Sequence, residues 1–352
     1  MQYLDSFDGK LDFIDETEWV FLDLWSLTDY LEGVPNKDQK TLAKYLNLDG
    51  IFQENDNPGV RYHNCNTTGV GMRFATDSPS IIIKAQIKRP YSYQNVTLCC
   101  THGFDIYVVN SYGASHMTVV APDEPYSVFA HEINLHQHNV VQIYFPTYND
   151  VINFSLGVKA GCCLSVAPSR NNSDVVCFYG NSRTQGASAS RSGNIFPNIV
   201  SRKLNTEIHN YSFSTGCRAE VSAAQQIIDN LSRQGRKMSA FILDYTANAM
   251  NLEEFSQRLY PFYKTIRDAY PNIPIVIINA FCAPYFDRHI KEVFSKVQKA
   301  GENTFFIDLK ELFGGLDLIA LTVDRMHYTD VGMFLVADKI CEYIKQGSPM
   351  FK

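Results

Sequence analysis

The first half of the chain is patterned as short apolar segments separated by turn-forming residues. Each segment is rich in β-branched or aromatic residues, and Gly, Pro, Asn or Asp separates it from the next. The predicted strands are residues 81–87, 96–100, 104–110, 116–121 and 139–145. Strands that recur every 10 to 20 residues or so, with no long helical pattern between most of them, are typical of an antiparallel sandwich. We therefore predict a β-sandwich (jelly-roll) domain over residues 1–170, with one short helix near residues 38–45.

The pattern changes after a polar stretch at residues 161–174, beyond which strand-like and helix-like periods alternate. An apolar run of strand type begins at Val175. Further strands are predicted at residues 207–212, 238–244, 273–279 and 304–309, and helices at 218–233, 252–269, 287–299 and 330–345. This alternation predicts a parallel sheet with helices on both faces, whose active site lies outside the carboxyl ends of the strands. We expect this α/β domain to span residues 171–352.

Composition and charge exclude several classes of protein. The formal net charge is −6 and no long basic run occurs, so nucleic acid is not an expected partner. No apolar run is long enough to span a bilayer and the first residues do not form a signal sequence, so we expect a cytoplasmic protein without a membrane partner. Homo-oligomerisation is compatible with the sequence and is not determined by it.

Nine cysteines are present, but no Cys-x-x-Cys pair. The adjacent pairs at residues 99–100 and 162–163 are predicted to lie on alternating faces of strands rather than in disulfide bridges. We therefore expect neither a disulfide framework nor a metal site, and no cofactor.

A serine lies at the junction between the first strand of the α/β region and a helix-like segment. The apolar run from Val175 ends abruptly in Gly180, Asn181 and Ser182. A serine on such a turn is exposed where backbone N–H groups and the positive end of a helix can stabilise an oxyanion. The same pattern also fits a serine that only caps a helix.

An aspartate and a histidine occur three residues apart just before the last predicted helix, at Asp324 and His327. A serine hydroxyl is a poor nucleophile until an imidazole accepts its proton, and a carboxylate fixes the tautomer of that imidazole. In a doubly wound sheet these residues can meet Ser182 at one edge. We predict Ser182 as nucleophile, His327 as base and Asp324 as its partner. The alternative is a surface turn in which Asp330 caps the last helix.

Two predicted loops at strand ends, residues 210–216 and 244–248, can supply oxyanion donors. We predict an oxyanion hole formed by the backbone N–H groups of Ser182 and Ser212 and the side-chain amide of Asn248. Each such donor contributes roughly 3 kcal/mol to the transition state. The alternative for Asn248 is a simple turn residue.

The residues around Ser182 resemble the first sequence block of the SGNH (GDSL-type) hydrolases. This block is Tyr-Gly-Asn-Ser-Arg-Thr-Gln-Gly at residues 179–186. The loop at Ser212, residues 244–248 and residues 324–327 resemble the second, third and fifth blocks, in the right order. The resemblance covers residues 174–346 and implies a flavodoxin-like fold with the catalytic and oxyanion residues predicted above.

Residues 103–107, Gly-Phe-Asp-Ile-Tyr, and residues 144–151 resemble the Gly-x-Asp-Leu-Tyr β-domain that precedes a subset of these hydrolases. This resemblance implies a jelly-roll module in a group often assigned as carbohydrate O-acetylesterases. We therefore expect a serine esterase that removes an acetyl group from an acylated carbohydrate through an acyl-enzyme. The alternatives are a lipid or thioester acyl hydrolase and a carbohydrate-binding protein whose catalytic site has decayed.

Three residues depart from the usual blocks. Asn181 stands where Asp or Ser usually precedes the nucleophile, and Ser212 replaces a glycine. Arg183 follows the nucleophile, where Ile or Leu is common. We predict that Arg183 binds a carboxylate or phosphate on the substrate; the alternative is an ion pair with an acidic residue in a neighbouring loop.

Overall fold

The computed structural model describes residues 16–54, 57–89, 93–111, 113–122, 127–136, 140–170, 172–280 and 283–351. Contacts between Cα atoms divide the chain into two compact units, each built from separate pieces of sequence. The β unit comprises the chain up to Leu42, Cys65–Ser169 and Ser190–Gly193. The α/β unit comprises Ala43–Asn64, Arg170–Ala189 and the chain from Asn194 onward. A single boundary at residue 170 does not describe this division. Residues 43–64 precede that boundary but lie in the α/β unit, and residues 190–193 follow it but lie in the β unit.

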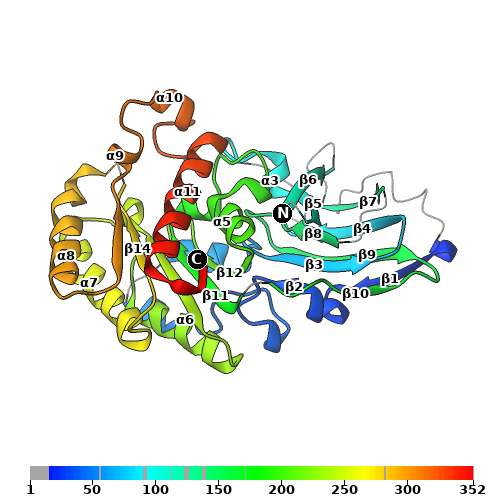
Figure 1. The fold of residues 1–352 in the computed structure, drawn as a ribbon, viewed down its shortest axis with the longest axis horizontal. Coiled ribbons are helices and arrows are strands. Elements are labelled where there is room, and N and C mark those ends of the chain that lie inside the picture. The colour runs from blue at the N-terminus through cyan, green and yellow to red at the C-terminus, as the bar shows by residue number, and fades with distance from the viewer. Residues whose placement is uncertain are drawn as a thin grey trace. The chain divides into compact units, whose positions relative to one another are not determined.

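The β unit contains two antiparallel sheets (Figure 1), which confirms the antiparallel β architecture predicted for this region. One sheet has the order β1 (Trp19–Asp23), β9 (Val151–Lys159), β4 (Ser80–Ile87) and β7 (Val128–Asn134). The other has the order β10 (Leu164–Val166), β3 (Gly71–Thr76), β8 (Val140–Tyr144), β5 (Phe104–Asn110) and β6 (Gly113–Val120), and β2 (Leu31–Glu32) pairs with β3. Apolar side chains from both sheets, including Phe74, Ile83 and Leu156, are fully buried in one core. The two sheets therefore pack face to face, as in a sandwich.

Helical segments are few and short in the described part of the β unit. They are η2 (Glu16–Glu18), η3 (Leu24–Tyr30), η4 (Lys37–Gln39) and α3 (Leu98–Thr101). The strand predicted at residues 96–100 is wrong, because the hydroxyl of Thr97 caps α3 by accepting from the Cys100 N–H at 3.2 Å. The short helix predicted at residues 38–45 is likewise absent, and only the single turn η4 forms there.

The cysteine pairs do not lie on strands as predicted. Cys99 and Cys100 belong to α3, while Cys162 and Cys163 lie in the connection between β9 and β10. All eight cysteines in the described ranges are free thiols.

Residues 190–193 belong to the β unit because two side chains of β5 hold them. The buried Asp105 carboxylate accepts from the Gly193 N–H at 2.7 Å and lies 3.2 Å from Arg191 Nε. The hydroxyl of Tyr107 accepts from Arg191 Nη2 at 3.3 Å. The Asp and Tyr of the Gly-Phe-Asp-Ile-Tyr segment therefore anchor a stretch of chain that follows the predicted nucleophile.

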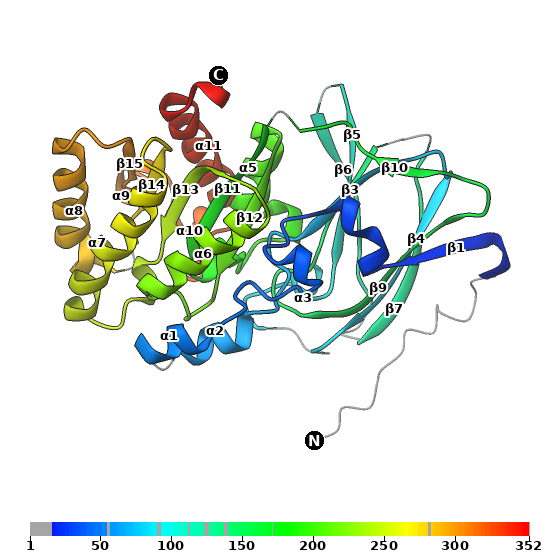
Figure 2. The same cartoon turned by 90° about the horizontal axis from the view of Figure 1, so that it is seen from below.

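The α/β unit is built on a five-stranded parallel sheet, which confirms the predicted α/β class. Its strand order is β12 (Thr206–Ser212), β11 (Asn172–Gly180), β13 (Met238–Asp244), β14 (Ile275–Ile278) and β15 (Thr304–Ile307). Figure 2 shows α5 (Phe196–Leu204) and α11 (Asp330–Gly347) on one side of this sheet, and α6 (Val221–Arg233), α7 (Leu252–Ala269) and α8 (Asp287–Lys299) on the other. None of the helices in the described part of the chain is long and apolar enough to cross a membrane.

Shorter helical segments connect these elements. They are α4 (Ser182–Gln185), η5 (Ser192–Asn194), η6 (Thr246–Asn248), η7 (Pro284–Phe286), α9 (Leu309–Leu312), α10 (Leu318–Leu321) and η8 (Pro349–Phe351). η5 spans the junction between the two units at residues 193 and 194.

Residues 43–64, which we call the amino-terminal arm, pack on the parallel sheet although the β unit surrounds them in sequence. The arm carries α1 (Asp49–Glu54) and α2 (Pro58–His63). Its Tyr45 ring stacks on Phe213 with a centroid distance of 5.2 Å, and Asn230 Nδ2 donates to the Lys44 carbonyl at 3.0 Å. The arm is thus part of the core of the α/β unit.

Candidate active site

The turn that carries Ser182 is formed by the end of β11 and the start of α4, as the sequence predicts. Asn181 is the N-cap residue, and its Oδ1 accepts from the Arg183 N–H at 2.9 Å. Asn181 Nδ2 donates to the Asp244 carbonyl at 2.7 Å, which ties the turn to the end of β13. A side chain at Gly180 would collide with Thr184, so the turn requires glycine there.

Asp324 and His327 lie in a tight turn between α10 and α11. The Val323 N–H donates to the His327 carbonyl at 2.9 Å, and Arg325 adopts a left-handed conformation with φ of 62°. Asp324 Oδ1 accepts from the N–H groups of Met326, at 3.0 Å, and His327, at 2.8 Å. The turn therefore holds the carboxylate and the imidazole in one fixed arrangement.

The structure brings the three predicted catalytic residues together. Ser182 Oγ lies 2.7 Å from His327 Nε2, although the two residues are 145 positions apart. His327 Nδ1 lies 2.7 Å from Asp324 Oδ2. Because a carboxylate only accepts, the proton belongs on Nδ1, and Nε2 is left to accept from the Ser182 hydroxyl. The hydrogen bonds between Ser182, His327 and Asp324 therefore run in the direction that general-base activation of a serine requires.

The surroundings favour an ionised Asp324. Partial burial acts to raise the pKa of its carboxyl, but hydrogen bonds from the backbone and imidazole of His327 and from the Met326 N–H outweigh burial and hold the pKa below its usual range. The Asp324 side chain is 41% exposed, whereas that of His327 is 12% exposed.

The predicted donors Ser212 and Asn248 lie at the end of β12 and in the turn that follows β13, the two strands that flank β11. Ser212 is the buried last residue of β12 and is paired in register with Gly180, which also pairs with Asp244. Asn248 is half-buried at the end of η6, and its Nδ2 donates to the Phe213 carbonyl at 3.1 Å. The sheet thus gathers these positions at one edge, and their role as donors stays a prediction.

Asp330 does not cap the last helix. Thr329 is the N-cap residue of α11, and Asp330 Oδ2 accepts from Asn194 Nδ2 at 2.7 Å. The alternative in which the Asp324 segment is only a surface turn with a helix cap is therefore not what the structure shows.

Arg183 requires a correction, because its side chain is fully buried and cannot meet a substrate from solvent. Its guanidinium forms an ion pair with Asp244, and lies 5.4 Å from the ring centre of Tyr328. Burial raises the pKa of Asp244, and the cation of Arg183, with donors from Thr184 and Asn181, opposes that rise. The alternative of an ion pair with an acidic residue is thus correct, although that residue, Asp244, ends strand β13 and does not lie in a loop. The signal in the sequence was Asp244 itself, a lone carboxylate at the end of an apolar strand.

Two further residues support the turn and are not indicated by any local pattern in the sequence. Gln185 Oε1 accepts from the Ser214 N–H at 2.7 Å, and its Nε2 lies 3.3 Å from Nδ1 of His63. Gln185 therefore links α4 to the loop that follows β12, and the amino-terminal arm supports it. No local pattern indicates this link, because the arm was predicted to belong to the β domain.

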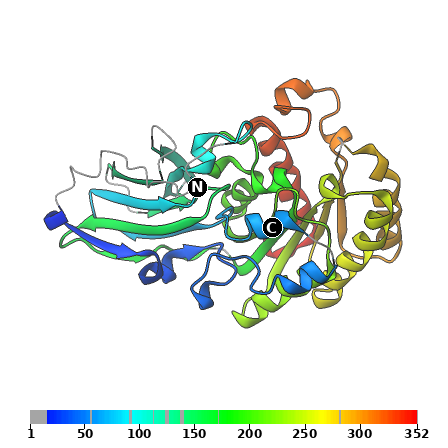
Figure 3. The same ribbon diagram turned by 180° about the vertical axis from the view of Figure 1, so that it is seen from behind.

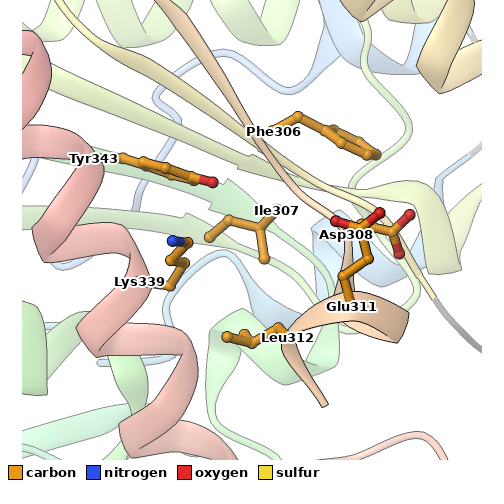
Figure 4. A pocket seen from close by; sticks show the side chains of 7 residues that line it. All are labelled: Phe306, Ile307, Asp308, Glu311, Leu312, Lys339 and Tyr343. Carbon is orange, nitrogen blue, oxygen red and sulfur yellow. The ribbon is translucent and has the colours of Figure 1, made fainter. Parts of the chain in front are cut away.

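A pocket of about 340 Å³ lies elsewhere in the α/β unit, at the end of β15. Asp308 and Glu311 lie close together at one end of it, with Lys339 and Tyr343 at the other (Figure 4). Asp308 is paired with Lys291 at 2.9 Å, and Lys339 with a glutamate of its own helix at 2.9 Å. The predicted catalytic residues do not line this pocket, and partners within the protein compensate these two charges. Within the described ranges, no three His, Cys, Asp or Glu side chains are placed to hold a metal ion.

Comparisons with protein families match both halves of the chain. Residues 173–345 match the GDSL-like lipase/acylhydrolase family. Residues 20–164 match the GxDLY family, described as the N-terminus of SGNH hydrolase-type esterases. These are the families that the sequence blocks resemble. No curated protein matches the chain.

Solved structures share the fold of the chain. A protein from Bacteroides ovatus ATCC 8483 described as a GDSL-like lipase is 22% identical, with a TM-score of 0.75 over 93% of this chain and 97% of its own. The salicylyl-acyltransferase SsfX3 of a tetracycline biosynthetic pathway is 17% identical, with a TM-score of 0.67 over 84% and 87%. A family two carbohydrate esterase from Clostridium thermocellum is 12% identical, with a TM-score of 0.56 over 80% and 93%.

Proposed function

Because the chain belongs to the GDSL-like lipase/acylhydrolase family and carries the N-terminal domain of SGNH-type esterases, we propose that it is a serine esterase acting on an acylated carbohydrate. The acyl group is small, and acetyl is the form we propose. The observation that carries the proposal is the hydrogen-bonded chain from Ser182 through His327 to Asp324. The GxDLY description supports an esterase and names no substrate, so the carbohydrate part of the proposal is carried over from the solved structure described as a carbohydrate esterase.

The proposed reaction follows from the direction of the hydrogen bonds between Ser182, His327 and Asp324. His327 Nε2 accepts the hydroxyl proton of Ser182 while Oγ attacks the ester carbonyl. The oxyanion that forms is bound by the N–H groups of Ser182 and Ser212 and the amide of Asn248. His327 then gives its proton to the departing sugar oxygen, and water repeats the sequence to release acetate from the acyl-enzyme.

The hydrogen-bonded catalytic chain also bears on the alternatives. A decayed binding protein has no need for an imidazole that lies 2.7 Å from a serine hydroxyl on one side and 2.7 Å from a carboxylate on the other. A lipid or thioester hydrolase would use the same triad, and the length of the acyl group separates it from a deacetylase. A deacetylase cleaves acetyl esters and rejects long acyl chains, whereas a lipase-like site prefers the long chains.

The proposal is tested by measuring acetate released from acetylated oligosaccharides together with covalent labelling by a fluorophosphonate. We expect the wild type to release acetate and to be labelled at Ser182. Ser182→Ala should lose both, while Ser256→Ala, which changes an exposed serine of α7, should keep both. Turnover retained by Ser182→Ala would refute the assignment.

A further inference from the structure

The segment that carries the predicted base also carries a run of exposed apolar side chains. Their exposed fractions lie between 38% and 78%. The residues, which we call the apolar rim, are Leu316, Leu318, Ile319, Val323 and Met326. Single exposed apolar residues are common on protein surfaces, but a concentrated group of them marks a contact surface.

The segment that carries the apolar rim is held in place by buried side chains and hydrogen bonds. Beneath it Phe313, Leu321 and Tyr328 are buried, and the rings of Phe313 and Tyr328 meet at a centroid distance of 5.7 Å. Thr329 joins α10 to the turn, because its N–H donates to the Leu321 carbonyl at 2.9 Å and its hydroxyl to the Ala320 carbonyl at 2.7 Å. Figures 1 and 3 show α10 standing clear of the helices that cover the sheet. The apolar side chains are therefore held out toward solvent by a well-packed segment.

The rim lies on a defined side of the scissile bond. Val323 precedes Asp324 and Met326 precedes His327, so apolar side chains flank both residues in the same turn. In acyl transfer the histidine gives its proton to the leaving oxygen, which must therefore lie on the histidine side of the ester. The leaving oxygen thus receives its proton from the imidazole whose turn carries Val323 and Met326.

The carboxylate of Asp324 is open to solvent at the surface of this turn. The side chain is 41% exposed, and water screens its interaction with His327. An apolar group lying over Val323 and Met326 would exclude that water and strengthen the hydrogen bonds of the carboxylate. Residues 316–326, which carry the rim, contain two carboxylates and one cation, Arg325, so the segment fits an apolar group better than an anionic lipid surface.

We propose that the apolar rim binds an apolar group attached to the alcohol half of the ester. The preferred substrate is then an acetylated sugar that bears an alkyl or aryl aglycone. This inference rests on the proposed function, because it names the class of sugar that the same site deacetylates.

The test compares two acetylated substrates that differ only in the aglycone, an acetylated methyl glucoside and the corresponding octyl glucoside below its micelle concentration. We expect kcat/KM to be about tenfold higher for the octyl compound, since an apolar contact of this size changes kcat/KM by that order. The double variant Ile319→Ser, Val323→Ser should lose most of this ratio. The control Val166→Ser changes a side chain of β10 that is 64% exposed, and it should keep the ratio.

Three results would overturn the inference. The first is a ratio of one in the wild type, and the second is a ratio that persists in the double variant. The third is a wild-type dimer that the double variant converts to monomers in sedimentation, which would assign the rim to contact between copies of the chain. Failure of the proposed function gives a different result. Neither glucoside would then release acetate, and Ser182 would not react with a fluorophosphonate. That result overturns both the proposed function and this inference.

Discussion

The guanidinium of Arg183 pairs with the carboxylate of Asp244, and both side chains are fully buried. The pair joins the residue after the predicted nucleophile to the end of the neighbouring strand β13. Two further donors, the Thr184 hydroxyl at 2.9 Å and the Asn181 amide at 3.1 Å, complete the surroundings of the carboxylate. The turn that presents Ser182 is therefore built around a buried charge pair.

Removing the cation should destabilise the protein strongly. Arg183→Ala leaves the Asp244 carboxylate buried without its counter-charge, which we expect to lower the free energy of unfolding by about 3 to 5 kcal/mol. The measurement is urea unfolding followed by circular dichroism. The matched control is Arg288→Ala, because Arg288 pairs with Glu292 on the surface and is 85% exposed. A similar small effect of both substitutions would contradict the structural role of the buried pair.

Replacing the carboxylate that orients the base should lower turnover without unfolding the protein. Asp324→Asn would present an amide to His327 Nδ1 and favour the tautomer that cannot accept the Ser182 proton. We expect kcat for acetate release to fall about 10³- to 10⁴-fold. Asp317→Asn is the control, since Asn can still cap α10 as Asp317 does. Nearly normal turnover by Asp324→Asn would show that His327 is oriented by another group.

The lowered pKa of Asp324 predicts how the free energy of unfolding depends on pH. The folded-state pKa of Asp324 lies below its ordinary value, so its hydrogen bonds stabilise the fold when the carboxyl is ionised. The difference in unfolding free energy between the wild type and Asp324→Asn should be constant above about pH 5 and shrink as the pH falls through the unfolded-state pKa of about 3.9 and then the folded one. Unfolding curves at a series of pH values measure this difference, and a difference that grows in acid would contradict the prediction.

The amino-terminal arm should matter for the stability of the α/β unit. Asn57 caps α2, and its Nδ2 also donates to the Gly216 carbonyl and, at 2.9 Å, to Glu220 Oε1. Asn57→Ala leaves these buried acceptors without their donor, and we expect a loss of about 2 to 4 kcal/mol from the cap and the buried bonds together.

Asn251→Ala is the matched control for the arm, because Asn251 is also an N-cap but is exposed at the start of α7. Its substitution should cost about 1 kcal/mol. Equal losses from the two variants, measured by thermal unfolding, would mean that the buried bonds of the arm add nothing beyond the cap.

Elements with a clear period along the chain are predictable to the residue. The bounds expected for β5, β13, α7 and α8 are those of the structure, because each has a regular pattern and abrupt ends. Residues 96–100 are not predictable in this way, since the cap at Thr97 favours a helix over the β propensity of its neighbours.

The residues of the candidate site also fall into those that the sequence indicates and those that it does not. Ser182, Asp324 and His327 are predicted from the sequence because their places beside patterned elements agree with the resemblance of their blocks to the SGNH hydrolases, and neither motif is sufficient alone. The burial of Arg183 cannot, since it depends on the register that places Gly180 beside Asp244, 64 positions away. The amino-terminal arm is missed for a related reason. Its partners, such as Asn230, lie far along the chain and leave no local pattern.

The two units are interleaved along the chain, so the amino-terminal arm is synthesised long before the residues against which it packs. Lys44 bonds to Asn230, 186 residues later, so a ribosome adding about 5 to 20 residues per second needs roughly 10 to 40 s to supply the partner of the arm. During that interval the arm leaves the ribosome without the sheet against which its Tyr45 ring is buried. The α/β unit therefore completes its core late in translation, and contacts of such long range make its folding slow compared with that of a local helical bundle.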